Sequence, residues 1–356
     1  MKVLLDGRPT LGGIHRYTTE LRRLLCESCS PLELFIFGQT AGIGRRLGPA
    51  GTGRPLPLVS ALRQMIADQI ILPCAARRSS AQIYHSPHGF LPRRLRLRTV
   101  VTCHDLWLLE GLATKPAGWK RYYDKWNFIH ALQHADQIVT PSQAVADKLK
   151  ARYGIDSRRV TCITPPIPKL ATDLSTKIPA RPYLLSVGTL EPRKNLMRLL
   201  DAQVQAFAKT RVPLYLVGPY GWRVKPILIR LAQVGAAARW LGQVEDSTLA
   251  MLYQHASALV QYSLDEGFDY PVAEGLKFGS PVVLSDIPVH KELAGELALF
   301  ASPLEPAQLA QRIEEVIDWP NSRRKEHAVR ARELIKRLEA LGSPERYWEV
   351  YRRALF

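Results

Sequence analysis

The chain has 356 residues, 46% of them hydrophobic and 23% charged, and a formal net charge of +17. Its length exceeds that of one ordinary hydrophobic core, so we expect two domains of about 170 residues each. The composition is that of a globular protein, and no segment approaches the roughly 20 apolar residues of a membrane-spanning helix. The five cysteines are odd in number and all lie in the first half, which favours reduced thiols and a cytoplasmic location.

Apolar segments of strand length recur along the whole chain and alternate with helical patterns. That alternation predicts an α/β fold with doubly wound parallel sheets, covered by helices on both faces. A proline-rich stretch, residues 164–182, divides the predicted strands into two sets. The first set comprises residues 2–7, 32–38, 81–87, 98–105 and 136–142, and the second comprises residues 182–188, 213–219, 238–242, 257–263, 280–286 and 297–303.

The positive charge is concentrated in the N-terminal half. Residues 1–170 contain 25 lysines and arginines against 11 aspartates and glutamates, a net charge of +14. Two arginine clusters, Arg77–Arg78 and the run from Arg93 to Arg98, accompany Ser60–Pro73, whose apolar residues roughly keep helical spacing. This combination suggests docking on an anionic membrane surface; the alternative is a half-buried core helix with solvated arginines nearby. No nucleic-acid-binding motif accompanies the charge, so we expect no nucleic-acid partner.

One candidate site follows the apolar strand that ends at Val187. Gly188 leads into a loop that carries Arg193 and Lys194, and Asn195 is the expected N-cap of a helix over residues 196–207. Adjacent cations just before a helix oppose its dipole. We therefore expect an anion to bind at Arg193 and Lys194.

A second candidate site lies in residues 264–285, where a strand, a loop, a helix and another strand follow one another. Glu266 stands before the loop, and Glu274 lies one turn into the helix. The loop that begins the helix offers N–H donors to an anion such as a diphosphate, and it consists of Gly267, which allows a tight turn, Phe268, Asp269 and Tyr270. The two glutamates can accept hydrogen bonds from hydroxyls on either side of the diphosphate; the alternative is that they only complement the helix dipole.

These segments resemble the family-4 retaining glycosyltransferases of the GT-B fold. The motifs that carry the resemblance are EPRKNL, LVGPYGW, the two glutamates of EGFDYPVAE, GSPVV and HKELAG, with GGIHRYTTEL, TCHDL and TPSQAVADKL nearer the N-terminus. The resemblance implies two Rossmann-like domains that face a central cleft. Residues 1–170 would form the acceptor-side domain and residues 171–343 the nucleotide-sugar domain, with the last helix, about residues 344–356, crossing back to the first domain.

The resemblance also implies roles for single residues. Arg193 and Lys194 would grip the donor diphosphate, Glu274 would bind the ribose and Glu266 the transferred sugar. His104 would sit at the sugar ring, although a histidine at a strand end can also be purely structural. The implied catalytic residues are His104, Arg193, Lys194 and Glu266, and the implied donor-binding residues are Gly12, Gly13, Gly188, Arg193, Lys194, Glu266, Gly267, Phe268, Asp269, Tyr270 and Glu274.

Other residues end strands or depart from the family pattern. His85 and His88 end a predicted strand, and we expect them on the acceptor side. His15 stands where the family commonly has a small residue, so the shape of the N-terminal loop can differ from that of the family. Asp269 stands where glycine is common, so the hydrogen bonds to the sugar can differ as well. The sequence contains no Asp-x-Asp triplet, the metal-holding motif of many other sugar-nucleotide transferases. We therefore expect no metal and no cofactor other than the nucleotide-diphosphate sugar substrate.

The resemblance implies a hexosyltransferase that retains the anomeric configuration, and the absence of an Asp-x-Asp triplet predicts that it is metal-independent. EPRKNL combined with HDL resembles enzymes that use GDP-mannose, so mannose is the expected sugar. The basic surface suggests a lipid-linked oligosaccharide acceptor, in polysaccharide or lipopolysaccharide assembly at the inner face of the cytoplasmic membrane. The alternative is a sugar-nucleotide epimerase or hydrolase on the same scaffold, which would need acid-base carboxylates at the sugar and no acceptor channel. A nonenzymatic sugar-nucleotide or lipid-binding protein is disfavoured by the full set of charged donor-site residues.

Overall fold

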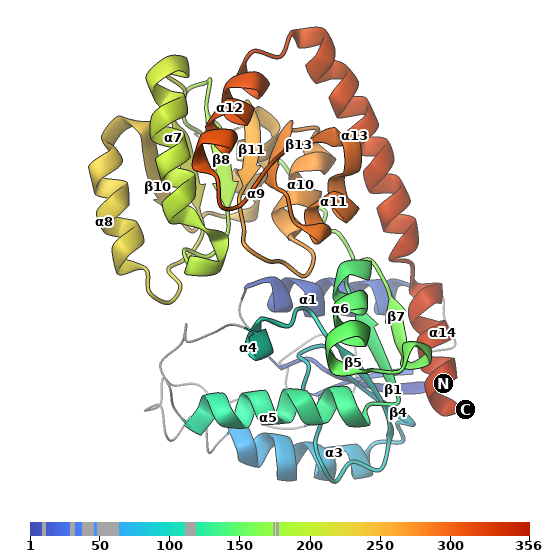
Figure 1. Ribbon diagram of the computed structural model, residues 1–356. Coiled ribbons are helices and arrows are strands. Elements are labelled where there is room, and N and C mark those ends of the chain that lie inside the picture. The colour runs from blue at the N-terminus through green and yellow to red at the C-terminus, as the bar shows by residue number, and fades with distance from the viewer. Residues whose placement is uncertain are drawn as a thin grey trace. The chain divides into compact units, whose positions relative to one another are not determined.

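The chain folds into two compact α/β units, shown in Figure 1. The computed structural model describes residues 1–8, 12–28, 33–37, 46–47, 64–110, 119–173, 175 and 178–356. Unit 1 comprises Met1–Pro166 together with Glu339–Phe356, and unit 2 comprises Ile167–Leu338. The sequence placed the boundary at residue 170 and the start of the returning segment at residue 344.

Unit 1 is built on a parallel sheet of strand order β3-β2-β1-β4-β5-β6-β7. Its strands are β1 (Lys2–Asp6), β2 (Glu33–Phe37), β3 (Arg46–Leu47), β4 (Ile83–Ser86), β5 (Arg98–Thr102), β6 (Gln137–Thr140) and β7 (Val160–Cys162). The five predicted strands of this half are all present. The sequence did not predict β3 and β7, because β3 has two residues and β7 has three that are only half buried.

Helices cover this sheet, and the apolar side chains of one of its faces pack into a buried core. They are α1 (Gly12–Glu27), a π-helical turn η1 (Ala67–Ile71), α3 (Leu72–Arg78), α4 (Trp107–Glu110), α5 (Trp119–His134), α6 (Gln143–Tyr153) and the 3-10 turn η2 (Ser157–Arg159). The helix predicted at Ser60–Pro73 is seen from residue 64, and residues 60–63 lie outside the described part of the chain. It continues beyond the predicted end, because Pro73 occupies the first turn of α3, where no N–H is needed.

The C-terminal helix α14 (Pro344–Leu355) belongs to unit 1, as the sequence predicted, and contacts β4, β5 and β6 (Figure 1). Two buried tyrosines of this helix form hydrogen bonds, one with Tyr17 of α1, which itself bonds Thr102 of β5, and the other with His85 of β4. The Tyr347 hydroxyl lies 3.2 Å from that of Tyr17, and the Tyr351 hydroxyl lies 2.8 Å from Nδ1 of His85. These bonds fix the last helix to the sheet of unit 1.

Unit 2 contains a second parallel sheet, with the strand order β10-β9-β8-β11-β12-β13. Its strands, all six predicted, are β8 (Leu184–Val187), β9 (Leu214–Val217), β10 (Ala238–Gly242), β11 (Ala258–Gln261), β12 (Val282–Ser285) and β13 (Ala298–Ala301). The order reverses between β8 and β11. In doubly wound sheets such a switch point opens a crevice beyond the carboxyl ends of the strands, where ligands bind.

Helices pack on this second sheet in two groups. The first group consists of α7 (Leu196–Thr210), α8 (Lys225–Val234) and α12 (Pro306–Ile317), and the second of α9 (Asp246–His255), α10 (Tyr270–Phe278) and α11 (Pro288–Ala294). Right-handed crossovers in opposite directions from the switch point place the two groups on opposite faces. The long helix α13 (Asn321–Leu341) ends the unit, and the short 3-10 turns are η3 (Pro192–Lys194), η4 (Gly235–Ala237) and η5 (Gly295–Leu297).

Glycines allow the ends of β8 and β9 to approach closely. A Cβ atom on Gly218 would lie 2.1 Å from the carbonyl oxygen of Gly188, and one on Gly221 would lie 2.8 Å from that of Leu190. The amide of Gly188 donates to the Val217 carbonyl at 2.8 Å, which joins the two strand ends. The glycines of LVGPYGW therefore serve backbone packing beside the loop of Arg193 and Lys194.

Candidate functional site

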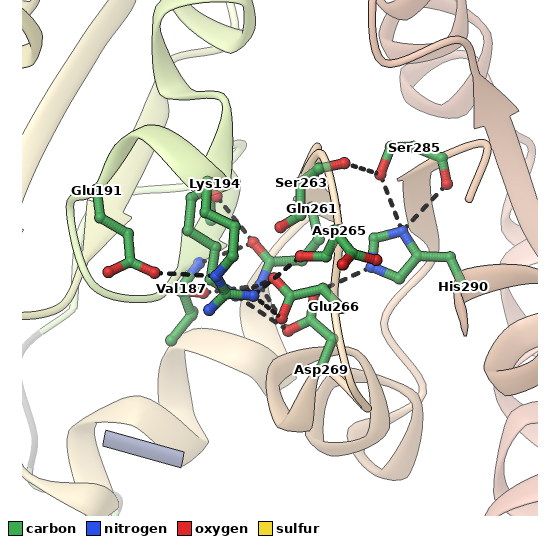
Figure 2. A network of polar contacts seen from close by, with 12 residues as sticks. Val187, Glu191, Lys194, Gln261, Ser263, Asp265, Glu266, Asp269, Ser285 and His290 are labelled. Carbon is green, nitrogen blue, oxygen red and sulfur yellow. Dashed lines mark hydrogen bonds and ion pairs between the residues drawn. The ribbon is translucent and has the colours of Figure 1, made fainter. Parts of the chain in front are cut away.

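The loops after β8 and β11 bring both sequence-predicted cations against Glu266 (Figure 2). Arg193 forms an ion pair with Glu266 through its Nη1, and Lys194 Nζ lies 2.7 Å from the other carboxylate oxygen of Glu266. Arg193 also donates to the Asp265 carbonyl oxygen at 2.9 Å and pairs with Glu191 at 3.1 Å. The three predicted residues thus form one cluster, although Glu266 lies more than 70 positions after the two cations in the sequence.

The electrostatics of this cluster follow from its burial. Burial alone would raise the pKa of Glu266, which is 5% exposed, but Arg193 and Lys194 hold that pKa well below its ordinary value. Burial would likewise lower the pKa of Lys194, but Asp269 and Glu266 raise it above its ordinary value. All three side chains are therefore charged at neutral pH. The sequence predicted that an anion binds at Arg193 and Lys194. In this structure the carboxylate of Glu266 occupies that place.

Asn195 occupies the predicted N-cap position of α7, but its side chain does not cap the helix. It stands before α7 in the left-handed conformation, with a φ of 56°, and makes no side-chain cap bond. Its side-chain amide donates instead to the Pro303 carbonyl oxygen at 2.7 Å, and its oxygen accepts from Arg198 at 3.1 Å. The residues before it form the turn η3, so the side chain of Asn195 ties the cation loop to the end of β13.

Asp269 is the residue of the second loop that turns the chain, rather than Gly267. Its φ is 68°, which glycine adopts without strain and which few other residues favour. The Asp269 carboxylate is fully buried, with Nε2 of His290 at 3.1 Å and Nζ of Lys194 at 3.6 Å (Figure 2). Nε2 of Gln261 donates to it at 3.3 Å. Asp269 therefore faces the protein interior in this structure.

The remaining predicted residues of this loop are also largely buried. Glu274, on α10, is 1% exposed, and its carboxylate accepts from the Tyr253 hydroxyl at 2.9 Å. Glu274 therefore offers almost no exposed surface to a ligand in this structure. The rings of Phe268 and Tyr270 meet edge to face, with centroids 5.3 Å apart. Helix α10 ends at Gly279, a left-handed cap with a φ of 80°, as expected for a helix that stops at glycine.

In unit 1, His104 and His88 follow the ends of β5 and β4. Nε2 of His104 lies 2.7 Å from the Pro87 carbonyl oxygen, and burial lowers the pKa of His104 to about 4. Because a carbonyl only accepts, Nε2 carries the proton of the neutral ring, and Nδ1 is left as an acceptor. Nε2 of His88 lies 3.6 Å from the buried carboxylate of Asp6, which ends β1. This part of unit 1 thus gathers polar groups at the carboxyl ends of three neighbouring strands.

The acceptor-side assignment of His85 is wrong. Its side chain is fully buried, and its ring nitrogens lie 2.8 Å from the Tyr351 hydroxyl and 2.9 Å from Oγ1 of Thr102. Burial lowers its pKa to about 3. His85 is the fourth strand's link to the C-terminal helix, because residues of one strand alternate between the faces of a sheet and this one points into the core.

The other predicted glycines and the unusual His15 lie at the start of α1. Gly12 has a φ of 62°, and both Gly12 and Gly13 are exposed in the first turn of the helix. His15 is exposed on the same helix. Gly188, in unit 2, lies under the Lys194 side chain, whose Cε would be 3.1 Å from an added Cβ. A side chain at position 188 would therefore push Lys194 out of place.

Sequence reasoning missed the polar residues that support the cluster from behind. Gln261 is the last residue of β11, whose other residues are apolar, and its side-chain amide forms hydrogen bonds with Ser186, Val187 and Asp269. His290 begins α11, beyond the end of β12, and contacts Ser285 and Asp269. A polar residue inside an apolar strand is itself a signal, because a buried amide must find partners. The position of His290 after a strand end was a weaker signal of a role in the site.

In the part of the chain that the structure describes, no group of three or more histidine, cysteine, aspartate or glutamate side chains is placed to hold a metal ion. No helix there is long and apolar enough to cross a bilayer.

The chain matches two sequence families of sugar-transferring enzymes. Residues 11–169 match the family described as Glycosyltransferase Family 4, and residues 181–318 match Glycosyl transferases group 1. The O-antigen chain mannosyltransferase B of Escherichia coli is 29% identical over 334 residues, which are 85% of this chain and 87% of that protein. The serotype-specific mannosyltransferase WbdA of Escherichia coli is 30% identical over 236 residues, which are 60% of this chain but only 28% of that protein.

Solved structures share the fold at lower identity. Sucrose-phosphate synthase from Thermosynechococcus elongatus superimposes with a TM-score of 0.77 at 18% identity, covering 99% of this chain and 98% of that one. WaaG, a glycosyltransferase involved in lipopolysaccharide biosynthesis, superimposes with a TM-score of 0.72 at 13% identity, covering 98% of both chains. These similarities show the α/β fold of each unit.

The Glu266 cluster leads to a prediction about stability. Glu266→Gln removes the charge that balances Arg193 and Lys194, so it should lower the free energy of unfolding at pH 7 by about 3–5 kcal/mol. Because the folded pKa of Glu266 is depressed, the wild-type advantage is present above its ordinary value of 4.5 and should shrink as pH falls below it. Urea unfolding from pH 7 to pH 3.5 measures both effects.

The matched control is Glu296→Gln, whose side chain is 92% exposed and pairs with Arg330 at 3.5 Å. An exposed pair contributes at most about 1 kcal/mol. Equal losses from the two substitutions, or a Glu266→Gln loss that does not depend on pH, would contradict the charge balance described for the cluster.

Proposed function

The chain belongs to the family-4 glycosyltransferases of the GT-B fold, and on that premise we propose that it transfers mannose from GDP-mannose with retention of the anomeric configuration. The acceptor is a lipid-linked oligosaccharide in the assembly of a surface polysaccharide. The observation that carries the donor half of this proposal is the pair of cations, Arg193 and Lys194, gathered with Glu266 at the switch point of unit 2. The mannosyltransferases among the relatives support the choice of sugar.

The cluster is suited to an exchange of partners. Arg193 and Lys194 are 16% and 11% exposed, so an entering diphosphate meets two cations that Glu266 already holds in place. As the diphosphate takes up their charge, the Glu266 carboxylate becomes available to hydroxyls of the attached sugar. This exchange gives each of the three residues the role that the family resemblance implies, and it requires no large movement of the loops after β8 and β11.

Transfer of the sugar from a nucleotide diphosphate depends more on stabilising the charge of the leaving diphosphate than on acid-base catalysis. The bond between the anomeric carbon and the diphosphate breaks, and the bond to the acceptor oxygen forms on the same face of the sugar. The departing phosphate oxygen takes the proton of the acceptor hydroxyl. Arg193 and Lys194 stabilise the charge that grows on the diphosphate, which is commonly the largest catalytic contribution. The neutral His104, with Nδ1 free to accept, would hold a sugar hydroxyl; no Asp-x-Asp triplet supplies a metal for the diphosphate.

The test of this function uses GDP-mannose carrying a labelled sugar. With a lipid-linked acceptor and excess EDTA, the protein should form a mannoside whose anomeric configuration, read by NMR, equals that of the donor. Lys194→Ala should lower kcat by about 10²–10³-fold, as expected when one group that stabilises developing charge is lost. The matched control is Lys209→Ala, an exposed lysine of the same unit that pairs with Glu314 at 2.8 Å.

Three results would contradict the proposal. Rapid formation of an epimer or of free sugar without any acceptor would support the epimerase or hydrolase alternative. An inverted product would exclude retention, and activity restored only by added Mn²⁺ or Mg²⁺ would exclude the metal-independent reaction.

The proposed membrane docking uses one face of unit 1. Exposed apolar side chains of η1 and α5, among them Ile70 at 57% and Tyr122 at 70% exposure, share this face with the arginine run. The guanidinium of Arg93 lies 3.5 Å from the ring centre of Trp126, and the Gln69 side chain accepts from the Arg93 amide at 3.1 Å. The face, which we call the docking face, consists of Ile66, Ile70, Ile71, Tyr122, Trp126, Arg93, Arg94 and Arg96.

The opposite side of η1 is fixed to the sheet. Asp68 is buried and forms an ion pair with Arg8 at 2.5 Å, and Arg8 also holds Asp6 at the end of β1. This anchor keeps the isoleucines of the same turn directed outward. Apolar side chains ringed by arginines are suited to the boundary between acyl chains and anionic headgroups.

A vesicle experiment tests the docking face. Wild-type protein should co-sediment with vesicles of anionic phospholipid at low salt, and replacement of Arg93, Arg94 and Arg96 by serine should release it, since each basic residue contributes on the order of 1 kcal/mol. The control replaces three exposed arginines of α13, which are Arg323, Arg330 and Arg337, by serine. Equal release by both variants, or equal binding of the wild type to neutral vesicles, would contradict docking through this face.

A further inference from the structure

Behind Lys194, unit 2 buries a second charged pair that no role so far explains. Asp269 and His290 are both fully buried, and Nε2 of His290 lies 3.1 Å from the Asp269 carboxylate (Figure 2). Asp269 adopts a left-handed backbone conformation at a position where the family pattern commonly has glycine. A charged residue in a conformation suited to glycine carries a cost in both strain and desolvation. Its partners indicate what offsets that cost.

The Gln261 side chain shows which groups donate to Asp269. Its oxygen accepts from the Ser186 hydroxyl at 3.0 Å and from the Val187 amide at 3.3 Å. Its nitrogen donates to the Val187 carbonyl at 2.7 Å, which fixes the orientation of the amide, and also donates to Asp269 at 3.3 Å. With this donor on one oxygen and Lys194 at 3.6 Å from the same oxygen, Asp269 is placed as an ionised carboxylate.

The hydrogen bonds around His290 determine its protonation. The Ser285 hydroxyl donates to the Ser263 carbonyl at 2.7 Å, so toward Nδ1 of His290, 3.1 Å away, this hydroxyl can only accept. The Ser285 carbonyl, also 3.1 Å from Nδ1, is an acceptor too. Nε2 faces the Asp269 carboxylate, which accepts as well. A neutral imidazole has one N–H, whereas both nitrogens here face acceptors, so a proton on each ring nitrogen satisfies every contact while Asp269 stays ionised.

We propose that His290 is a positioning residue of the donor site, which as an imidazolium neutralises Asp269 and thereby leaves Lys194 available to the donor diphosphate. Lys194 lies between two carboxylates, those of Glu266 at 2.7 Å and Asp269 at 3.6 Å. If Asp269 lacked its own cation, it would attract Lys194 away from the diphosphate. His290 supplies that cation from the interior side. This inference rests on the proposed donor site.

Two substitutions separate this role from simple packing. His290→Leu replaces the imidazolium by an apolar side chain of similar size. The dissociation constant for GDP, measured by calorimetry, should then rise at least tenfold. Asp269→Gly removes the carboxylate and suits the φ of 68°. In the Asp269→Gly background no charge remains for His290 to neutralise, so the double variant Asp269→Gly with His290→Leu should bind GDP within about threefold of Asp269→Gly alone.

The matched control is His327→Leu, which removes another buried histidine of unit 2 whose Nε2 contacts the Leu297 carbonyl at 3.2 Å. It should leave GDP binding unchanged. A His290→Leu variant that binds GDP as the wild type does would overturn the proposal, and so would an equal loss in both backgrounds, since packing alone would produce it. Wild-type protein that binds none of GDP, UDP and ADP would refute the donor site itself.

A second measurement needs no ligand. With ¹⁵N-labelled histidine, and with the His290 signals identified by their absence in His290→Leu, both ring nitrogens should show imidazolium chemical shifts at pH 7. In Asp269→Asn the carboxylate is lost while the side-chain shape remains, and the second proton should be lost with it. A neutral ring in the wild type, or an imidazolium that persists in Asp269→Asn, would overturn the proposal even if the donor site is correct.

Discussion

The constraint on which the rest of unit 2 depends is a cluster of two cations and one carboxylate, held beyond the ends of β8 and β11 with little exposure to solvent. Taking a charge out of water costs several kcal/mol per ion, and only good geometry offsets that cost. Glu266 meets Arg193 and Lys194 through separate oxygens, and the Asp265 carbonyl accepts a further guanidinium bond. Beside this cluster, Gly188 and Gly218 allow the ends of β8 and β9 to approach closely.

The balance of charge extends outward from the cluster in two directions. Toward solvent, Glu191 pairs with Arg193; toward the interior, Asp269 faces Lys194 and is itself neutralised by His290. The site therefore holds its cations in place before a ligand arrives. Such preorganisation is what a group transfer with a diphosphate leaving group requires, because the stabilising charges need not move during the reaction.

The sequence predicted local elements well and long-range partners poorly. Apolar runs bounded by glycine and proline located eleven strands, because a strand buried on both faces needs little beyond its own residues. Asn195 and His85 were misassigned because their partners, Pro303 and Tyr351, lie 108 and 266 positions away. The predicted cations and Glu266 do meet. The sequence did not predict that Glu266 neutralises these cations. It marked Asp269 as unusual for its position but did not predict that His290 is the partner of its carboxylate.

A crystal structure of the protein with bound GDP tests the central claim most directly. The account predicts that diphosphate oxygens lie within about 3.2 Å of Lys194 Nζ and of the Arg193 guanidinium, while Asp269 keeps its contact with His290. A diphosphate bound elsewhere, with both cations still paired to Glu266 as they are in this structure, would contradict it.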